Sequence, residues 1–335
     1  MTVRVGINGF GRIGRDILRC ALERSKSPVE VIAVNDVAPA GTMAHLLEFD
    51  STYGRLRVPV TVDGSDILVG DRRVRVLSTA DPAGLPWRDL GVDVVIESSG
   101  RFRSREAAAA HLTAGARKVV ISAPGKDVDA TIVLGVNEDQ YDPYRHDVLS
   151  NASCTTNCAA PMVKVLHRAF TIHRGLMTTI HSYTNDQALL DSPHKDLRRA
   201  RSAAVNMIPT STGAARAIGQ VLPLLEGRLD GVAVRVPVED GSLTDLTVEV
   251  ANPVTPAQVN RAFAEAAEDD LKGILRYTEA PIVSRDVIGD PASCVFDANL
   301  TSTQDHLVKV FGWYDNEWGY AHRTLDLVEL IARNL

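Results

Sequence analysis

The sequence has few of the residues that hold small secreted folds together. Only four of its 335 residues are cysteine, and aromatic residues make up 5% of the chain. Four scattered cysteines in so long a chain are too few for a disulfide framework, so reduced thiols are expected. Each cysteine is therefore expected either to fill a core or to take part in chemistry.

Long apolar runs and a basic surplus are also missing. No stretch approaches the roughly 18 apolar residues of a membrane span. The first residues enter a strand pattern without the basic and apolar regions of a signal peptide. We therefore expect a cytoplasmic protein with no membrane partner. The formal charge of -6 argues against nucleic acid as the main partner, because binding to a phosphate backbone requires a basic face.

The composition that remains is that of a soluble globular protein. Apolar residues make up 45% and charged residues 23% of a chain long enough for two domains. Nearly continuous apolar runs of strand length recur in the first part of the chain, at residues 3–7, 29–34, 92–96, 119–121 and 131–134. A helical pattern separates the first two runs. Such runs are typical of parallel strands buried on both faces, so a Rossmann β-α-β arrangement is predicted.

The character of the sequence changes after Cys154. Longer strand-like segments with alternating polarity follow, at residues 176–182, 231–238, 244–251 and 306–314. Alternation is typical of antiparallel strands with one open or subunit-facing side. We predict an α/β protein with a Rossmann dinucleotide-binding domain (1–152), an α+β catalytic domain with a mostly antiparallel sheet (153–317), and a C-terminal helix closing onto the first domain (318–335).

A glycine pattern marks a candidate cofactor site. Gly9, Gly11 and Gly14 follow a predicted strand and open a predicted helix. In that context the first glycine allows a tight turn, the second lets the backbone approach a pyrophosphate, and the third permits close packing. The helix N-terminus would then hold the phosphates. Taken alone, the pattern could equally be an ordinary glycine-rich turn.

Asp36 adds a second signal, because it ends the second predicted strand. A carboxylate there would bind the adenosine ribose hydroxyls and repel a 2′-phosphate, which favours NAD over NADP. The competing interpretation is an aspartate that caps the next helix.

Cys154 is the candidate nucleophile. It lies where a strand-like segment gives way to a helical one, and a helix N-terminus together with an imidazolium lowers a thiol pKa from about 8.5. Cys158, four residues on, is more simply a buried helix residue than half of a metal pair, and no metal site is predicted. His181 ends an apolar strand, a position that a structural histidine also takes.

Four segments together carry a resemblance to a known family. They are NGFGRIGR (8–15), SNASCTTNC (150–158), HSYTNDQ (181–187) and WYDNEWGY (313–320). In this order they resemble the NAD-dependent, phosphorylating glyceraldehyde-3-phosphate dehydrogenase family over essentially the whole chain. The resemblance implies oxidation of D-glyceraldehyde 3-phosphate to 1,3-bisphosphoglycerate with NAD, through a thioester on Cys154 with His181 as its base.

The same resemblance implies further site residues. The cofactor positions are Gly9, Gly11, Arg12, Ile13, Gly14, Asp36, Ser122 and Asn316. The substrate phosphate positions are Thr184, Asp186 and Arg235. The positions for inorganic phosphate are Ser153, Thr155, Arg199, Thr212 and Gly213. One departure is Ala80, which stands where the family usually has an arginine near the adenine.

Several readings of the chain stay open. The family is usually a homotetramer, and the resemblance implies the same here. Erythrose-4-phosphate dehydrogenase shares the fold and the thiol, although Thr184-Asn185-Asp186 matches the glyceraldehyde-3-phosphate enzyme better. Ala159-Ala160 beside the nucleophile also allows an inhibitor-tolerant isozyme. A non-catalytic RNA-binding or regulatory protein is a third reading, which the intact thiol, histidine and phosphate positions disfavour.

Overall fold

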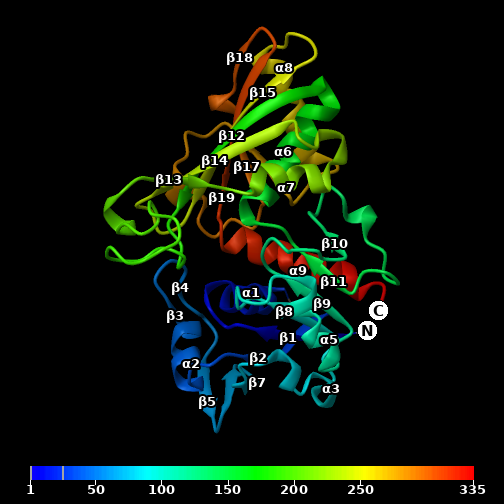
Figure 1. Cartoon of the computed structure of the whole chain (residues 1–335), viewed down its shortest axis with the longest axis vertical. Coiled ribbons are helices and arrows are strands. Elements are labelled where there is room, and N and C mark those ends of the chain that lie inside the picture. The colour runs from blue at the N-terminus through cyan, green and yellow to red at the C-terminus, as the bar shows by residue number, and fades with distance from the viewer. Residues whose placement is uncertain (1, 25) are drawn as a thin grey trace. The chain divides into compact units, whose positions relative to one another are not determined.

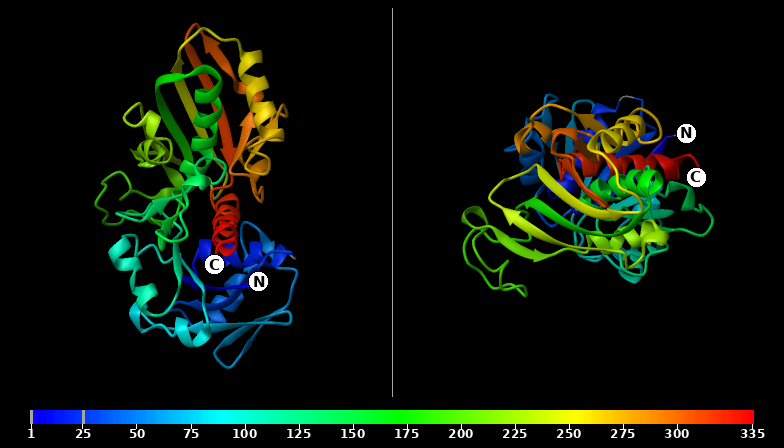
Figure 2. Two further views of the ribbon diagram at one scale, coloured as in Figure 1. Left: turned by 90° about the vertical axis from the view of Figure 1, so that its right-hand side faces the viewer. Right: turned by 90° about the horizontal axis from the view of Figure 1, so that it is seen from above.

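The computed structural model of the chain describes residues 2–24 and 26–335. Contacts within it define two compact units. The first takes in the chain up to Ile132, together with Glu138–Ala152 and Ala321–Leu335. The second consists of Val133–Asn137 and Ser153–Tyr320. Each unit is built around its own sheet (Figures 1 and 2).

The first unit contains a nine-stranded sheet in the order β10-β11-β9-β8-β1-β2-β7-β6-β5. Its strands are β1 (Val3–Asn8), β2 (Val29–Asn35), β5 (Val60–Asp63), β6 (Asp66–Val69), β7 (Arg72–Leu77), β8 (Val94–Glu97), β9 (Lys118–Ile121), β10 (Ala130–Thr131) and β11 (Val148–Ser150). A separate pair is formed by β3 (Phe49–Asp50) and β4 (Gly54–Arg55). The helices are α1 (Arg12–Glu23), α2 (Ala40–Glu48), α3 (Trp87–Leu90), α4 (Arg105–Ala108), α5 (Ala110–Thr113) and most of α9 (Trp318–Ala332).

Parallel pairing brings polar residues to one edge of this sheet. β1 lies between β2 and β8 and pairs with both in parallel. Asn8, the last residue of β1, is in register with Asn35 on one side and Glu97 on the other. Because the chain leaves β1 toward β2 and later returns on its other side, this edge is the point where a doubly wound sheet binds its ligand.

α1 and α9 lie side by side within the first unit (Figure 1). Arg24 follows α1, and its Nη1 donates to Asp326 Oδ1 at 2.6 Å. Ser27 Oγ donates to Glu329 Oε1 at 2.7 Å. These contacts attach the end of the chain to the first β-α-β segment.

One predicted strand is largely wrong. Of residues 131–134 only Thr131 is in a strand, β10, whereas Ile132 and Val133 are buried without strand pairing. Val133 begins a turn, since its carbonyl accepts from Val136 N at 3.0 Å. A short run of buried apolar residues has no periodicity, so the sequence could not distinguish a strand from a buried turn.

The second unit contains an eight-stranded sheet in the order β13-β14-β12-β15-β19-β17-β16, with β18 paired to β19. Its strands are β12 (Ile172–Ser182), β13 (Ile208–Ser211), β14 (Leu229–Val236), β15 (Ser242–Val250), β16 (Leu275–Thr278), β17 (Cys294–Asp297), β18 (Ser302–Gln304) and β19 (Leu307–Tyr314). Its helices are α6 (Cys154–Phe170), α7 (Ala214–Val221) and α8 (Pro256–Glu268). The sheet is mostly antiparallel, but β12 pairs with β14, and β16 with β17, in parallel.

Alternating burial gives this second sheet two different faces. Buried and half-buried residues alternate along the whole of β15. On the helix-covered face, Phe263 of α8 stacks on Phe296 of β17 with ring centroids 3.8 Å apart; Figure 2 shows these helices against the sheet. The opposite face is hollowed and charged, with Lys309 Nζ bonded to Asp245 Oδ1 at 2.5 Å. The predicted fold class, Rossmann plus α+β, is confirmed.

Within residues 2–24 and 26–335, none of the helices combines the length and the apolar character needed to cross a bilayer.

Two helical glycines of the first unit provide a matched stability test. A Cβ on Gly14 would lie 2.2 Å from Gly9 O, whereas a Cβ on Gly41 would meet nothing within 4 Å. Gly14→Ala should lower the free energy of unfolding by about 1–3 kcal/mol, because backbone must move. Gly41→Ala should be neutral or stabilising by up to about 1 kcal/mol. Denaturant unfolding measures both, and equal effects would contradict the close packing at Gly14.

Candidate functional site

The loop between β1 and α1 has the backbone geometry that the glycine pattern predicts. Gly9 has φ +90°, and a Cβ there would lie 2.4 Å from Ser99 N. A Cβ on Gly11, the residue before α1, would meet nothing within 4 Å, so the backbone is open to a ligand. The first turn of α1 contains no acidic residue and its N-cap makes no side-chain hydrogen bond. These features fit a pyrophosphate at the helix N-terminus.

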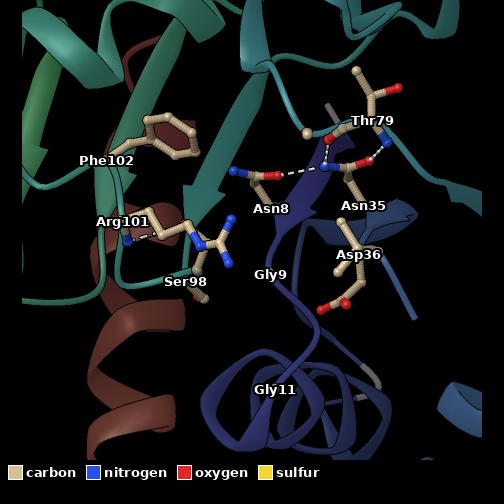
Figure 3. Close-up of a pocket in the computed structure, with 12 residues that line it drawn as sticks. Asn8, Gly9, Gly11, Asn35, Asp36, Thr79, Ser98, Arg101 and Phe102 are labelled. Carbon is tan, nitrogen blue, oxygen red and sulfur yellow. Dashed lines mark hydrogen bonds between the residues drawn. The ribbon is translucent and has the colours of Figure 1, made fainter. Parts of the chain in front are cut away.

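A pocket of about 210 Å³ lies above this loop (Figure 3). Its lining residues come from the ends of several strands and the loops that follow them: Asn8, Gly9, Gly11, Asn35, Asp36, Val37, Thr79, Ala80, Ser98, Ser99, Arg101 and Phe102. Its volume is below the roughly 300 Å³ at which drug-sized sites begin, so it suits part of a dinucleotide.

Asp36 lies in the wall of this pocket. Its carboxylate accepts from Phe10 N at 2.8 Å and from Ala38 N at 3.0 Å. The N-cap of α2 is Pro39, so Asp36 does not cap that helix. The carboxylate instead holds the glycine loop and faces the pocket, which suits a ribose with two free hydroxyls.

Three other predicted cofactor residues take different positions in the first unit. Arg12 and Ile13 begin α1, but the Arg12 guanidinium pairs with Asp50 at 2.5 Å and lies 5.7 Å from the ring centroid of Tyr53. The backbone of Arg12 is therefore the part left facing the loop. Ser122 follows β9, and its Oγ donates to Glu97 O at 3.2 Å.

In the second unit, Cys154 is the first residue of α6. Ser153 caps this helix, with its Oγ accepting from Thr156 N at 3.0 Å. The residue before the cap, Ala152, has φ +55°, a left-handed conformation that costs a non-glycine residue roughly 1 kcal/mol. The cap and the strained turn together fix where α6 begins and place the thiol at the positive end of its dipole.

His181, near the end of β12, meets this thiol. Its Nε2 lies 3.5 Å from Cys154 Sγ. Its Nδ1 lies 2.7 Å from Arg235 Nη1, which also donates to Ser182 O at 2.9 Å. Ser182 O lies 2.8 Å from the same Nδ1, so this nitrogen stands between a group that only donates and one that only accepts, and either ring tautomer of His181 finds a partner there. Arg235 reaches His181 because β12 and β14 are parallel and pair these two residues.

Burial keeps both members of this pair neutral. It raises the pKa of the Cys154 thiol to about 11, against the opposing effect of Arg235. Burial, followed by the nearby Arg235, lowers the pKa of His181 to about 3. Creating the two charges together is the favourable way to ionise the site, because a thiolate and an imidazolium 3.5 Å apart attract each other.

Two neighbouring side chains are held by hydroxyl groups. Tyr314 OH lies 2.8 Å from both Thr155 Oγ1 and Thr179 Oγ1, and its ring meets His181 edge-on with centroids 5.9 Å apart. Asn316 Oδ1 accepts from Ser182 Oγ at 2.8 Å and from Ser242 Oγ at 2.7 Å. This arrangement fixes the amide plane of Asn316 and leaves its NH₂ group as the donor.

Two of the predicted phosphate residues pair with each other. Arg199 pairs with Asp186, so the structure joins one residue from each predicted phosphate set. Arg199 Nε also donates to Thr210 Oγ1 at 2.9 Å. Gly213 precedes α7, and Thr212 Oγ1 accepts from Ala214 N at 3.2 Å.

The remaining predicted phosphate residues lie nearer to the thiol. The hydroxyls of Ser153 and Thr155 are already bonded, to Thr156 and Tyr314 respectively. Thr184 lies in the loop that follows β12. Arg235 contacts His181 Nδ1, and after burial the positive charges of Arg235 and, to a smaller extent, Arg199 lower the pKa of His181.

Sequence reasoning missed the polar floor of the pocket. Asn35 Nδ2 donates to Asn8 Oδ1 at 2.7 Å and to Thr79 O at 2.9 Å, and Asn35 Oδ1 accepts from Thr79 N at 2.9 Å (Figure 3). An asparagine at the end of each of two parallel strands was the available signal. Arg101 and Phe102 carried no signal, because neither belongs to a motif.

Comparison with known proteins identifies the class and the family. Residues 3–105 match the NAD-binding domain model of glyceraldehyde 3-phosphate dehydrogenase, and residues 153–316 match its C-terminal domain model. The chain is 58% identical to glyceraldehyde-3-phosphate dehydrogenase 1 of Streptomyces avermitilis over 335 residues, covering 100% of each chain. It is 58% and 57% identical to the glyceraldehyde-3-phosphate dehydrogenases of Streptomyces coelicolor and Mycobacterium avium over 337 and 340 residues, with 100% of each chain covered.

The fold, the cofactor pocket and these matches define an NAD-dependent oxidoreductase. The sequence-based predictions of NAD as the cofactor and of enzymatic activity are confirmed. More particularly, the chain belongs to the glyceraldehyde-3-phosphate dehydrogenase family, as the four sequence segments predicted.

Asp36 should set the choice between NAD and NADP. Asp36→Asn removes the charge that would repel a 2′-phosphate, and its single amide oxygen keeps one of the two acceptors that Phe10 N and Ala38 N now use. The NAD-to-NADP ratio of kcat/KM should fall by about tenfold or more, since one close charge contact contributes roughly 1.5–3 kcal/mol. Steady-state kinetics with both cofactors measures the ratio. An unchanged ratio would remove Asp36 from the ribose site.

His181 should control the reactivity of Cys154. In His181→Asn, alkylation of Cys154 by iodoacetamide at pH 7 should slow by at least about tenfold, because no imidazole shares the thiol proton. Since burial raises the Cys154 pKa to about 11, the rate in the variant should keep rising toward alkaline pH instead of levelling off. The buried Cys20, Cys158 and Cys294 are internal controls in peptide mapping. A profile identical to that of the wild type would refute the pairing.

Proposed function

We propose that this enzyme oxidises D-glyceraldehyde 3-phosphate with NAD and inorganic phosphate to 1,3-bisphosphoglycerate. The observation that carries the proposal is the contact of Cys154 Sγ with His181 Nε2 at 3.5 Å, beside two arginines. A thiol at a helix start with a histidine partner suits covalent attack on an aldehyde. Two cations suit a phosphorylated substrate and a phosphate nucleophile.

The proposed reaction begins at Cys154. The thiol loses its proton to His181 as sulfur bonds to the aldehyde carbon, and His181 passes that proton to the aldehyde oxygen, giving a hemithioacetal. The backbone N–H of Cys154, at the start of α6, is suited to stabilise the oxygen that becomes negative during this attack. Loss of hydride from the carbon, with the hydroxyl proton taken up by His181, leaves a thioester. NAD, when bound, supplies the acceptor for that hydride.

Phosphate then completes the reaction. An oxygen of inorganic phosphate attacks the thioester carbonyl, the carbon–sulfur bond breaks, and the thiolate of Cys154 leaves. His181 returns a proton to the sulfur. The energy of the aldehyde oxidation is thereby kept in an acyl phosphate rather than lost to hydrolysis.

Arg235 links substrate binding to the base. Its Nη1 lies 2.7 Å from His181 Nδ1, and in the tautomer in which Nδ1 accepts this hydrogen bond the imidazole proton lies on Nε2, facing the sulfur. We assign Arg235 to the substrate phosphate, and a phosphate that draws the guanidinium away allows the ring to change tautomer, its one proton passing from Nε2 to Nδ1 by exchange with solvent. Nδ1 then donates to Ser182 O, 2.8 Å away, and Nε2 presents its lone pair to the thiol. Binding of the substrate phosphate therefore prepares His181 to accept the thiol proton.

The remaining site assignments follow the family positions. Thr184 and Asp186 accompany Arg235 at the substrate phosphate, and the set for inorganic phosphate consists of Ser153, Thr155, Arg199, Thr212 and Gly213. The fixed amide of Asn316, with its NH₂ group free to donate, is assigned to the nicotinamide carboxamide. The backbone of Arg12 and Ile13 is assigned to the pyrophosphate, and Ser122 to the nicotinamide side.

Three wider expectations belong to the same proposal. The enzyme acts in the cytoplasm and assembles as a homotetramer. Its working domains are residues 1–152, 153–317 and 318–335, with the last helix attached to the first domain. The salt bridge of Arg24 with Asp326 supports that attachment.

A spectrophotometric assay tests the reaction. NADH should form steadily with D-glyceraldehyde 3-phosphate and phosphate together, and should nearly stop when phosphate is omitted. Erythrose 4-phosphate serves as the competing substrate. A higher kcat/KM for erythrose 4-phosphate, or turnover independent of phosphate, would overturn the proposal.

The two arginines should have separable effects. Arg235→Leu should raise KM for the sugar phosphate, and Arg199→Leu should raise KM for phosphate, each by about tenfold or more, since each loses charge-assisted hydrogen bonds. Arg235→Leu should also shift the pH dependence of Cys154 alkylation, because it removes the group on His181 Nδ1. Equal impairment of both substrates by each variant would overturn the two-site assignment.

A further inference from the structure

The pocket above the glycine loop contains a positively charged side chain, Arg101, that has no role in the proposed reaction. Arg101 is the one cationic residue among the described residues that line it. In Figure 3, Arg101 and Phe102 form one wall, Asn35 and Asp36 lie opposite, and Gly9 runs between them. The Arg101 guanidinium points into the space between these walls.

Arg101 lacks the side-chain partner that several other arginines of the first unit have. Arg12 pairs with Asp50, Arg24 with Asp326, and Arg105 with Asp129. The guanidinium of Arg101 forms no hydrogen bond or ion pair with any described residue; only its backbone N–H does, to Ser99 Oγ at 3.2 Å. An arginine held in a pocket wall without a partner is available to a ligand.

Hydrogen bonds to Glu97 fix the loop that carries Arg101. Glu97, the buried last residue of β8, accepts from Ser99 N at 2.8 Å and from Ser99 Oγ at 2.5 Å. Its other oxygen accepts from Asn8 Nδ2 at 2.5 Å and lies 3.0 Å from His111 Nε2. Trp87 Nε1 donates to His111 Nδ1 at 3.0 Å, which leaves the histidine proton on Nε2, for Glu97.

This network joins the loop to the strand ends before any ligand binds. Ser99 in turn accepts from the backbone of Arg101, so the position of the Arg101 main chain follows from Glu97. A binding residue on a preordered loop loses less entropy when the ligand arrives. Arg101 is exposed to solvent, as Arg103 is, but its fixed main chain and its place in the pocket wall favour a binding role.

We propose that Arg101 is a cofactor-binding residue that holds the adenosine diphosphate half of NAD. The two negative charges of the pyrophosphate and the flat adenine are both groups that a guanidinium binds, by charge-assisted hydrogen bonds or by stacking. Ala80 and Thr79, which line the same pocket, offer only small side chains and no charge. Asp36 confers selectivity against a 2′-phosphate, and Arg101 provides the attraction.

This inference rests on NAD being the cofactor and not on the identity of the aldehyde. Its test is therefore direct binding without turnover. Isothermal titration of the full-length enzyme with ADP and with adenosine separates the contribution of the phosphates from that of the ring. Arg101→Leu is compared with Arg103→Leu, an exposed arginine two residues along that does not line the pocket.

Arg101→Leu should raise the Kd for ADP by about tenfold, and Arg103→Leu should leave it within about twofold. Weaker adenosine binding in Arg101→Leu as well would assign the contact to the adenine ring; a change for ADP alone would assign it to the phosphates. Arg101→Lys should retain ADP binding in the second case and lose it in the first. Unchanged ADP and adenosine binding in Arg101→Leu, or equal losses in Arg103→Leu, would overturn the proposal whatever the enzyme's substrate.

Discussion

The contact between the Cys154 thiol and the His181 imidazole is the interaction on which the proposed chemistry depends. Sγ and Nε2 lie 3.5 Å apart because α6 begins exactly one residue after its serine cap and β12 extends to Ser182. A start of α6 one residue later would turn the thiol by about 100° around the helix axis. The cap on Thr156 and the left-handed Ala152 before it are therefore part of the site.

Positive charge at the thiol pair is the second constraint, and it follows from the topology of the sheet. In an otherwise mostly antiparallel sheet, β14 runs parallel to β12 and sets Arg235 against His181. Arg199 reaches the same region from the loop after β12, paired with Asp186. Burial disfavours an isolated thiolate or imidazolium, so the site relies on charges that form and disappear together. Anionic substrates suit such surroundings, because they balance the two arginines.

Local features of the site could be predicted from the sequence. Gly9 and Gly14 adopt the turn and the packing that their spacing predicts, Asp36 lies at the end of the second strand, and Cys154 begins a helix. Each of these depends on neighbours a few residues away. The alternating pattern of the second half also predicted its sheet correctly, as β15 shows.

Contacts between residues far apart in the chain could not be predicted from local sequence patterns. The contact of Arg235 with His181 spans 54 residues and depends on a strand order that no local pattern specifies. The buried chain from Trp87 through His111 to Glu97 is similar, since its members come from three separate elements. Buried polar groups need partners, but sequence alone does not say which ones. Motif positions located the reactive groups, whereas their protonation and orientation required the three-dimensional arrangement.

The central claim is that oxidation leaves an acyl group on Cys154 that phosphate removes. Intact-protein mass measurement of the NAD-loaded enzyme after mixing with D-glyceraldehyde 3-phosphate, without phosphate, tests it directly. We expect one acyl group per chain on the peptide that contains Cys154, in an amount equal to the NADH formed, and its rapid loss as an acyl phosphate when phosphate is added. NADH formation without that adduct, or an adduct that phosphate leaves in place, would contradict the account.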